Sequence, residues 1–168
     1  MGLIHLIRHA EPTLSGVFLG RADPGLRLRP QRSSVTVECV FSSPLRRARD
    51  TASALFPDCE MVVLNELTEL SLGEWDGLTW EEIERRDPDL AAQKLADWNH
   101  VTPPGGESYA AIEGRARTAV EHFRIASANS AIAVVAHSGI NAALWSQLTG
   151  HPPERFSQNY LEVITCEL

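Results

Sequence analysis

The 168-residue sequence predicts one α/β domain over residues 1–168, with a mostly parallel central sheet and helices on both of its faces. Short apolar or β-branched segments alternate along the chain with segments whose apolar residues recur at helical spacing. Two of the short segments, 2–8 and 131–136, are apolar at nearly every position, which is typical of strands buried on both faces. Hydrophobic residues make up 43% of the chain, which is enough for the core of a single domain.

The N-terminal part of the chain is predicted to form two strands and a helix. The first strand covers 2–8, and residues 10–34, which contain repeated Pro and Gly, follow as a loop. The β-branched residues of 35–41 predict a second strand. Ser43 is suited to cap a helix whose first position is Pro44. The apolar stripe of this helix consists of Leu45, Ala48, Ala52 and Leu55.

The middle of the chain is predicted to form a third strand over 61–64 and two helical pieces. Thr79 and Glu82 have the spacing of a capping box, which predicts the start of a helix there. Pro88 is expected to break or kink that helix. A further helical piece then extends to about Trp98.

The C-terminal part of the chain continues the alternation of helices and strands. A Pro- and Gly-rich loop at 103–106 precedes a long helix that Ser108 can cap. A buried strand at 131–136, a helix at 140–149 and a last strand at 160–166 complete the predicted fold. The apolar face of the long helix consists of Ile112, Ala116, Ala119, Val120 and Phe123.

The charge of the chain is distributed unevenly. The formal net charge is −7, yet residues 1–50 carry eight arginines and only four acidic residues, whereas the excess of acidic residues lies in 51–168. The acidic total argues against a nucleic acid or an anionic membrane as the partner. The cationic N-terminal third favours a small anionic ligand instead.

The composition also predicts a cytoplasmic protein without a metal or cofactor. The sequence shows no secretory signal pattern and no apolar run long enough to span a membrane. The three cysteines, Cys39, Cys59 and Cys166, match no metal-binding spacing. They are interpreted as small hydrophobic residues in a reducing compartment.

Basic side chains follow three of the predicted strands. Arg8 and His9 follow the first strand, Arg46 and Arg47 follow the second, and His137 follows the strand at 131–136. In open α/β sheets the carboxyl ends of the strands form the ligand site, so these side chains are expected to converge. A guanidinium suits an oxyanion such as phosphate, and an imidazole can act as a nucleophile or an acid/base. The other histidines, interpreted as structural, are His5, His100, His122 and His151.

A helix is predicted to follow directly after the strand at 131–136 and His137. The backbone N–H groups of Ser138 and Gly139 are expected to form an anion site there. A Gly-punctuated segment at 67–77 adds carboxylates that could serve as a general acid. From the residues alone, Glu69, Glu74 and Asp76 remain equivalent candidates.

Taken in order, these motifs resemble the histidine phosphatase superfamily, the phosphoglycerate-mutase-like proteins. The match extends over nearly the whole chain, and five ordered motifs are far more specific than any one of them. The motifs are Arg8-His9-Ala10-Glu11, Ser43-Pro44-Leu45-Arg46-Arg47-Ala48, Glu69 with Gly73 and Gly77, Gly105-Gly106-Glu107-Ser108, and His137-Ser138-Gly139.

The resemblance implies a role for each site residue. His9 would be the nucleophile that becomes phosphohistidine, and Arg8, Arg47 and His137 would hold the phosphoryl oxygens. Glu69 would donate a proton to the leaving oxygen and later activate water. The two flanking arginines should lower the pKa of His9 and keep it neutral. A bound phosphate dianion should in turn favour proton uptake by Glu69.

The sequence departs from the family pattern at Ser15, over residues 24–34, and at Asn141, where many members carry an Arg soon after the second histidine. Ser15 stands where many members carry an Asn that contacts the phosphate, so Ser15 joins Ser138 among the predicted phosphate-binding residues. The first covering helix of the family is truncated or missing over 24–34, which should leave one sheet face partly uncovered and favour a homodimer. Position 138 is not Asp, which disfavours the acid-phosphatase branch.

The predicted function is therefore a metal-independent phosphomonoesterase that hydrolyses a small phosphorylated metabolite. Pieces of the sequence resemble the α-ribazole phosphatases, and a sugar phosphate is an alternative substrate. Because the chain is short, little room remains for a lid, and water should reach phosphohistidine. Two other functions stay open: a phosphoglycerate-type mutase and a weakly catalytic protein that binds a phosphorylated ligand.

Overall fold

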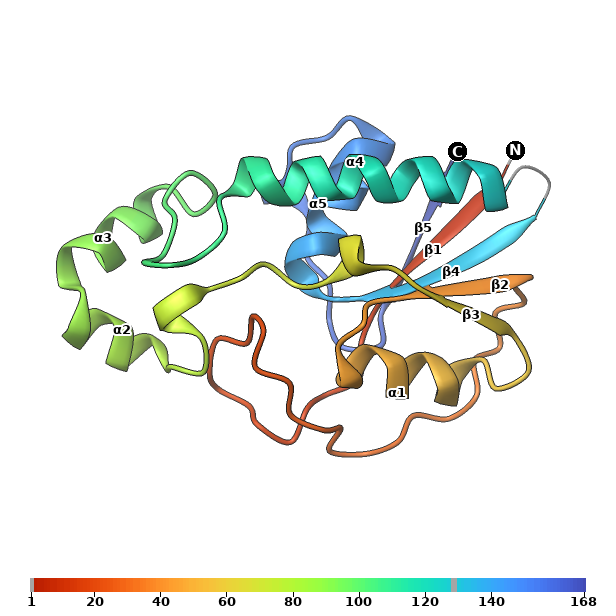
Figure 1. Cartoon of the computed structure of the whole chain (residues 1–168), viewed down its shortest axis with the longest axis horizontal. Coiled ribbons are helices and arrows are strands. Elements are labelled where there is room, and N and C mark those ends of the chain that lie inside the picture. Colours follow the sequence, from red (N-terminus) through yellow and green to blue (C-terminus); the bar gives the residue numbers. More distant parts are fainter. Residues whose placement is uncertain (1, 128–129) are drawn as a thin grey trace.

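The structure is a computed structural model that describes residues 2–127 and 130–168. A five-stranded sheet forms its centre, with the order β3-β2-β4-β1-β5 (Figure 1). Four strands are parallel, and β5 pairs with β1 in the antiparallel direction, so the mostly parallel sheet is confirmed. The strands are β1 (Leu3–Arg8), β2 (Cys39–Ser42), β3 (Glu60–Val63), β4 (Ala131–Ala136) and β5 (Val163–Glu167).

Helices cover both faces of the sheet, as predicted. The helix α1 lies on one face and α4 and α5 lie on the other, whereas α2 and α3 project beyond the sheet (Figure 1). None of the helices in the described part of the chain is long and apolar enough to cross a membrane. The α-helices are α1 (Arg46–Leu55), α2 (Trp80–Arg86), α3 (Pro88–Ala96), α4 (Tyr109–Ala126) and α5 (Ser138–Thr149). Short 3₁₀ turns are Asn65–Leu67, Gly73–Trp75 and Pro153–Arg155.

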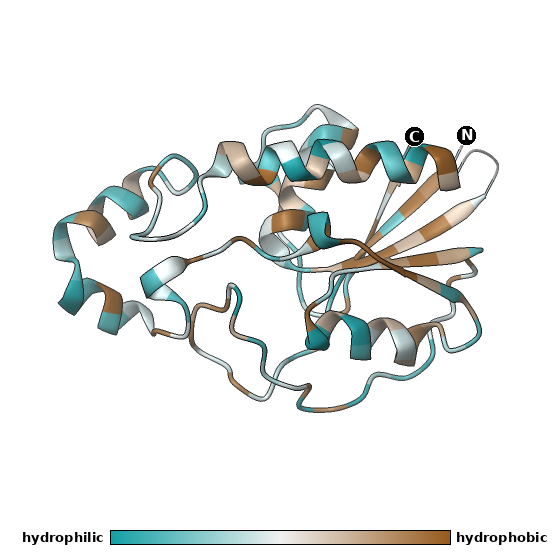
Figure 2. Ribbon diagram, in the orientation of Figure 1, coloured by the Kyte–Doolittle hydropathy of each residue, from teal (hydrophilic) through white to brown (hydrophobic). Residues whose placement is uncertain are grey.

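The hydrophobic core has two layers because alternate residues of a strand point to opposite faces. Ile4 and Leu6 of β1 belong to the layer under α4 and α5, whereas Ile7 packs with Ala48 and Ala52 of α1. Every residue of β4 from Ile132 to Ala136 is fully buried. Figure 2 shows these apolar strands between α1 and α4, helices of mixed hydrophilic and hydrophobic character. The two-sided burial inferred from the sequence is thus confirmed.

Several helix starts follow the predicted capping chemistry. The Ser108 hydroxyl accepts a hydrogen bond from the backbone N–H of Ala111, at 3.3 Å. The predicted capping box is present: the Thr79 hydroxyl accepts a hydrogen bond from the backbone N–H of Glu82, and the Glu82 carboxylate accepts one from the backbone N–H of Thr79. Pro88 begins α3 as well as ending the preceding helix, because proline fits the first helical turn.

Two strands begin later in the structure than the sequence predicts. The strand predicted over 35–41 begins only at Cys39. Its neighbour β4 starts at Ala131, so the residues before Glu38 have no ladder partner despite their β-branched side chains. The strand predicted over 160–166 begins at Val163, because Leu161 adopts a positive φ of 63° and breaks the extended run.

The start of α1 also differs from the prediction. Ser43 does not cap the helix; Leu45 is the N-cap residue and provides no side-chain hydrogen bond. The carboxylate of Asp23 accepts hydrogen bonds from the backbone N–H groups of Arg46 and Arg47 instead. The Ser43 hydroxyl is used elsewhere, since it lies 2.8 Å from Nε2 of His137. At the other strand end, α5 begins at Ser138, two residues before the predicted start.

The covering helix that the sequence predicts to be truncated is absent from residues 9–38, all of which the structure describes. A single bridge between Pro12 and Leu26 orders part of this loop. On the α1 side of the sheet, the outer strip of β1 and β5 is partly uncovered, with Leu3 37% and Val163 39% exposed. Self-association through this strip stays a prediction.

Candidate active site

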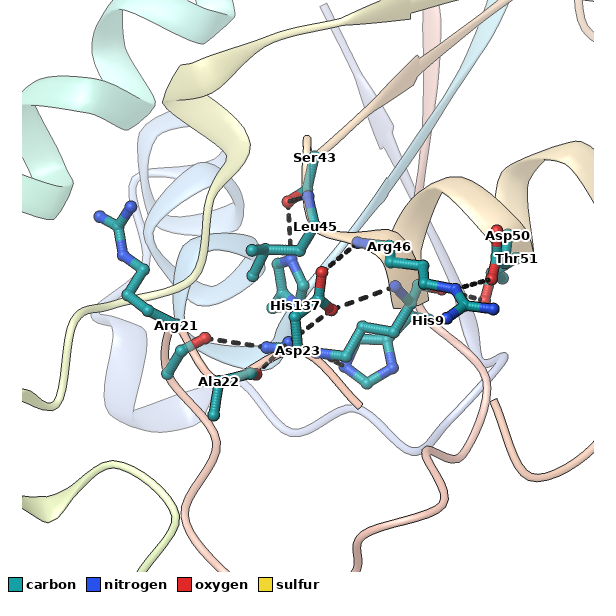
Figure 3. A network of polar contacts seen from close by, with 12 residues as sticks. His9, Arg21, Ala22, Asp23, Ser43, Leu45, Arg46, Asp50, Thr51 and His137 are labelled. Carbon is teal, nitrogen blue, oxygen red and sulfur yellow. Dashed lines mark hydrogen bonds and ion pairs between the residues drawn. The ribbon is translucent and has the colours of Figure 1, made fainter. Parts of the chain in front are cut away.

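His9 and His137 follow two adjacent strands. Arg8 of β1 is paired with Ala136 of β4, so the next residue of each strand reaches the same edge of the sheet. The two imidazole rings lie 5.0 Å apart between centroids and are almost fully buried (Figure 3). The convergence that the sequence predicts is therefore present.

The hydrogen bonds of His9 define which of its nitrogens can react. Nδ1 lies 2.7 Å from the carbonyl oxygen of Ala10 and donates its proton there. Nε2 is then unprotonated and accepts a hydrogen bond from Nε of Arg47, at 3.2 Å. Burial lowers the pKa of His9 to about 3; the Ala10 bond opposes this shift, while the charges of Arg47 and Arg8 add to it. The result is a neutral imidazole with its lone pair on Nε2.

His137 is also held neutral, beside His9. Complete burial lowers its pKa well below the usual value, and the nearby charge of Arg47 adds to this effect. Its Nε2 pairs with the Ser43 hydroxyl, whereas Nδ1 has no hydrogen-bond partner among the described residues. The sequence offered Ser43 as a helix cap, so its contact with His137 was missed.

Arg8 is held from two sides at the end of β1. One terminal nitrogen donates to the backbone oxygen of Gln158, at 2.9 Å. The guanidinium carbon lies 4.0 Å from the ring centroid of Tyr160, a cation–π contact, and the same ring lies 5.6 Å from that of His9. Nε of Arg8 is buried and finds no hydrogen-bond partner in the described part of the chain. Sequence reasoning missed Tyr160, because it lay inside a predicted strand.

Arg47 is fully buried, and its guanidinium is held by a neighbouring loop. It donates to the backbone oxygens of Gly20 and Ala22, at 2.9 and 2.7 Å, and to the carboxylate of Asp23, at 3.2 Å. Figure 3 shows Asp23 beside Arg46, at the start of α1. The remaining hydrogen bond of the Arg47 guanidinium runs from its Nε–H group to Nε2 of His9.

Glu69 lies at the N-terminus of α5. Its carboxylate accepts hydrogen bonds from the backbone N–H groups of Gly139 and Ile140, at 3.0 and 3.1 Å, and from that of Leu70, at 2.8 Å. A Cβ at position 139 would lie 2.6 Å from Oε1 of Glu69, so the carboxylate can take this position only beside a glycine. The predicted anion site at this helix end therefore holds a carboxylate of the chain itself.

The other two candidate carboxylates serve the structure. Asp76 accepts hydrogen bonds from the backbone N–H groups of Gly20, Arg21 and Ala22, at 2.7 to 2.8 Å. Glu74 forms an ion pair on the surface with Arg86, the last residue of α2. Asp76 thus fixes the loop that surrounds Arg47, and Glu69 is the candidate that lines the same cavity as His9.

A cavity of about 350 Å³ brings several of the predicted site residues together. Arg8, His9, Glu69 and Ser138 line it, and the neighbouring walls are mostly apolar. Arg47 and His137 are buried behind this lining. Ser15 is not brought into it: its side chain is exposed and accepts a hydrogen bond from Arg27, at 3.3 Å. The apolar lining consists of Val17, Phe18, Leu19, Leu70, Leu72, Trp98 and Tyr160.

The Gly-Glu-Ser motif supports the site from outside. Both carboxylate oxygens of Glu107 accept hydrogen bonds from Arg115, at 2.8 Å each. Arg115 also donates to the backbone oxygens of Glu66 and Thr68, and so fixes the segment that leads into Glu69. Within residues 2–127 and 130–168, no group of three or more His, Cys, Asp and Glu side chains is arranged to hold a metal ion.

Known proteins share this fold and sequence pattern. A 27% identical relative, the adenosylcobalamin/alpha-ribazole phosphatase of Escherichia coli, matches over 89% of this chain and 80% of its own length. The solved alpha-ribazole phosphatase of Shigella flexneri superposes with a TM-score of 0.86 at 24% identity, covering 97% of this chain and 89% of its own, which shows the shared fold.

A second kind of relative is longer than this chain. The bifunctional protein Rv2228c of Mycobacterium tuberculosis is 34% identical over 79% of this chain, but the match covers only 40% of that protein. The model of the histidine phosphatase superfamily (branch 1) matches residues 4–167. This chain belongs to the histidine phosphatase superfamily.

Proposed function

We propose that the protein is a phosphomonoesterase that works through phosphohistidine on His9. The observation that carries the proposal is the unprotonated Nε2 of a neutral His9 in one cavity with the Glu69 carboxyl group. Nε2 attacks phosphorus while the ester P–O bond breaks, and Glu69 in its protonated form gives its proton to the leaving oxygen. Glu69 then takes a proton from water, whose oxygen attacks phosphorus and releases His9 and phosphate.

The surrounding donors can stabilise the phosphoryl group during transfer. Nε of Arg8 is available to one oxygen. The Nε–H of Arg47 points at Nε2 of His9, and becomes available to a second oxygen once that nitrogen bonds phosphorus. Fixed donors of this kind stabilise the charge that develops on the equatorial oxygens. The dianionic substrate also favours the protonated form of Glu69 that the first step needs.

The substrate we propose is a small phosphorylated metabolite, either α-ribazole phosphate or a sugar phosphate. The name of the Escherichia coli relative supports the first choice. Hydrolysis is favoured over mutase transfer because Trp98 and Tyr160, which line the pocket, are 45% and 37% exposed, so water can reach the intermediate. The three cysteines are free thiols, which supports a reducing compartment such as the cytoplasm.

Rapid-quench kinetics with p-nitrophenyl phosphate test this function. We expect a burst of p-nitrophenolate equal to the enzyme concentration, together with acid-labile phosphate on the protein. His9→Ala should abolish both signals, whereas His122→Ala, a change at an exposed histidine of α4, should alter neither. Normal turnover by the His9→Ala variant would contradict the mechanism. Binding of phosphate without any turnover from pH 5 to 8 would favour the alternative of a phospho-ligand binding protein.

A further inference from the structure

A second cavity, of about 340 Å³, adjoins the catalytic pocket. The two share part of their walls, namely Leu70, Trp98, Ser138 and Gly139. Glu69, the proposed proton donor to the leaving oxygen, immediately precedes Leu70 in this shared wall. An alcohol that extends from that oxygen is therefore directed past Trp98 into the second cavity. The apolar residues found only in the second cavity are Val101, Ile112, Ala142, Pro153 and Phe156.

The shared wall is fixed by a buried lysine. Lys94 is only 3% exposed, and its Nζ donates to the backbone oxygens of Trp98 and Val101. The ammonium group also lies 5.0 Å from the ring centroid of Trp98. These contacts use two of the three N–H donors of the one cationic residue in the described lining, and two carboxylate residues, Glu107 and Glu154, line the same cavity.

The remaining polar groups make the second cavity unsuitable for a carboxylate. Glu107 and Glu154 line it, and the charge of Glu107 is already matched by Arg115. The Tyr109 hydroxyl is buried without a hydrogen-bond partner in the described residues. Burial, with the nearby charges of Glu113 and Glu154, raises the pKa of Tyr109 to about 12, so it stays a neutral donor. A cavity with apolar walls and two hydroxyl-bearing residues, Tyr109 and Ser138, fits an amphipathic group.

We propose that the second cavity is a subsite for the distal part of the alcohol, and that it accepts amphipathic groups that are uncharged or cationic and rejects carboxylates. The proposal rests on the function proposed above, because it assigns the two ends of one phosphate ester to two adjoining cavities. It narrows the substrate class to esters larger than the catalytic pocket alone can hold.

A series of biphenyl-4-yl phosphates tests the charge preference on the unmodified protein. The distal ring carries hydrogen, an aminomethyl group or a carboxylate at its 4′ position, far from phosphorus. We expect kcat/KM for the first two to exceed that for the carboxylate by at least about tenfold, since burying an unpaired charge is costly. Equal values for all three would overturn the subsite. Failure to turn over even p-nitrophenyl phosphate would instead overturn the proposed function.

A cavity-filling substitution tests the location. Ala142 lines the second cavity and not the catalytic pocket, so Ala142→Leu should lower kcat/KM for biphenyl-4-yl phosphate by about tenfold or more. The value for p-nitrophenyl phosphate, which fits the catalytic pocket, should change less than about twofold. Ala110→Leu makes the same change at an exposed position of α4 and should affect neither substrate. An equal loss for both substrates, or no loss for either, overturns the proposal.

Discussion

The N-termini of α1 and α5 are two similar places in the molecule with different uses. Each helix follows the carboxyl end of a strand, and each N-terminus receives a carboxylate from a distant loop, Asp23 on α1 and Glu69 on α5. Asp23 is also paired with the buried guanidinium of Arg47. Among the described residues, Glu69 accepts hydrogen bonds from backbone N–H groups alone, and it lines the catalytic pocket. Asp23 is tied to a guanidinium buried behind the pocket lining, whereas Glu69 belongs to that lining, where a substrate can contact it.

The largest difference between the two carboxylates should appear in catalysis. Glu69→Gln keeps an oxygen for the helix N–H groups but removes the transferable proton. We expect kcat for an alkyl phosphate to fall by about 10² to 10⁴, the usual range for loss of a general acid. The loss should be much smaller for p-nitrophenyl phosphate, whose leaving group needs little protonation. Equal losses for the two substrates in steady-state assays would contradict the assigned role.

Asp23 should matter more for stability than for chemistry. Asp23→Ala removes the cap of α1 and leaves Arg47 without its carboxylate, so we expect the free energy of unfolding to fall by about 2 kcal/mol. Asp23→Asn keeps an acceptor for the helix and should lose less. Urea denaturation measures both variants. If Asp23→Ala is as stable as the unmodified protein, Asp23 has no stabilising role, and the contrast with Glu69 fails.

Acid should destabilise both helix ends through the neutral imidazoles beside them. The pKa values of His9 and His137 are lowered from 6.5, to about 3 for His9, so the unfolded chain binds more protons than the folded one below pH 6.5. Stability is complete above that pH and is lost as the pH falls toward 3. His9 alone should cost about 2 kcal/mol at pH 5.

The measurement is denaturation at pH 7 and pH 5. His9→Gln should reduce the loss between the two pH values, and His122→Gln, at an exposed position, should leave it unchanged. The same loss in His9→Gln as in the unmodified protein would show that His9 does not contribute to the acid sensitivity.

The smallest expected effect tests how closely Glu69 must sit on its helix. Gly139→Ala adds a Cβ that would lie 2.6 Å from Oε1 of Glu69, so the carboxylate must shift. We expect kcat/KM to fall by about tenfold, because small misplacements of a catalytic group are costly. The thermal midpoint should not fall in parallel, because alanine favours the helix more than glycine does. A proportional loss of stability and activity would point to a general packing defect.

The fold was largely predictable from the sequence, because burial leaves a pattern in neighbouring residues. The strands β1 and β4 were evident from their continuous apolar character, and the start of α4 from Ser108. The extent of β2 was not, since the β-branched residues before Cys39 have a strand preference but no partner. A partner is set by where a distant strand begins, and local composition does not record that.

The site was predictable in its members more than in its contacts. Arg8, His9 and Glu69 meet in one cavity as the motifs imply. The occupants of the two helix ends were not predicted, because Asp23 and Glu69 lie in irregular segments without periodicity. The stacking of Tyr160 on Arg8 is equally non-local, and joins residues at opposite ends of the chain.

The order of the strands has a consequence for how the molecule assembles. The strand β4 lies between β1 and β2, which do not pair with each other, although it is the fourth of the five strands in the sequence. Until β4 emerges during synthesis, the two N-terminal strands lack their common neighbour, and contacts across such long separations form slowly. The partner ring of His9 arrives with that strand. A nascent chain therefore brings the rings of His9 and His137 together only when the central strand of its sheet has been inserted.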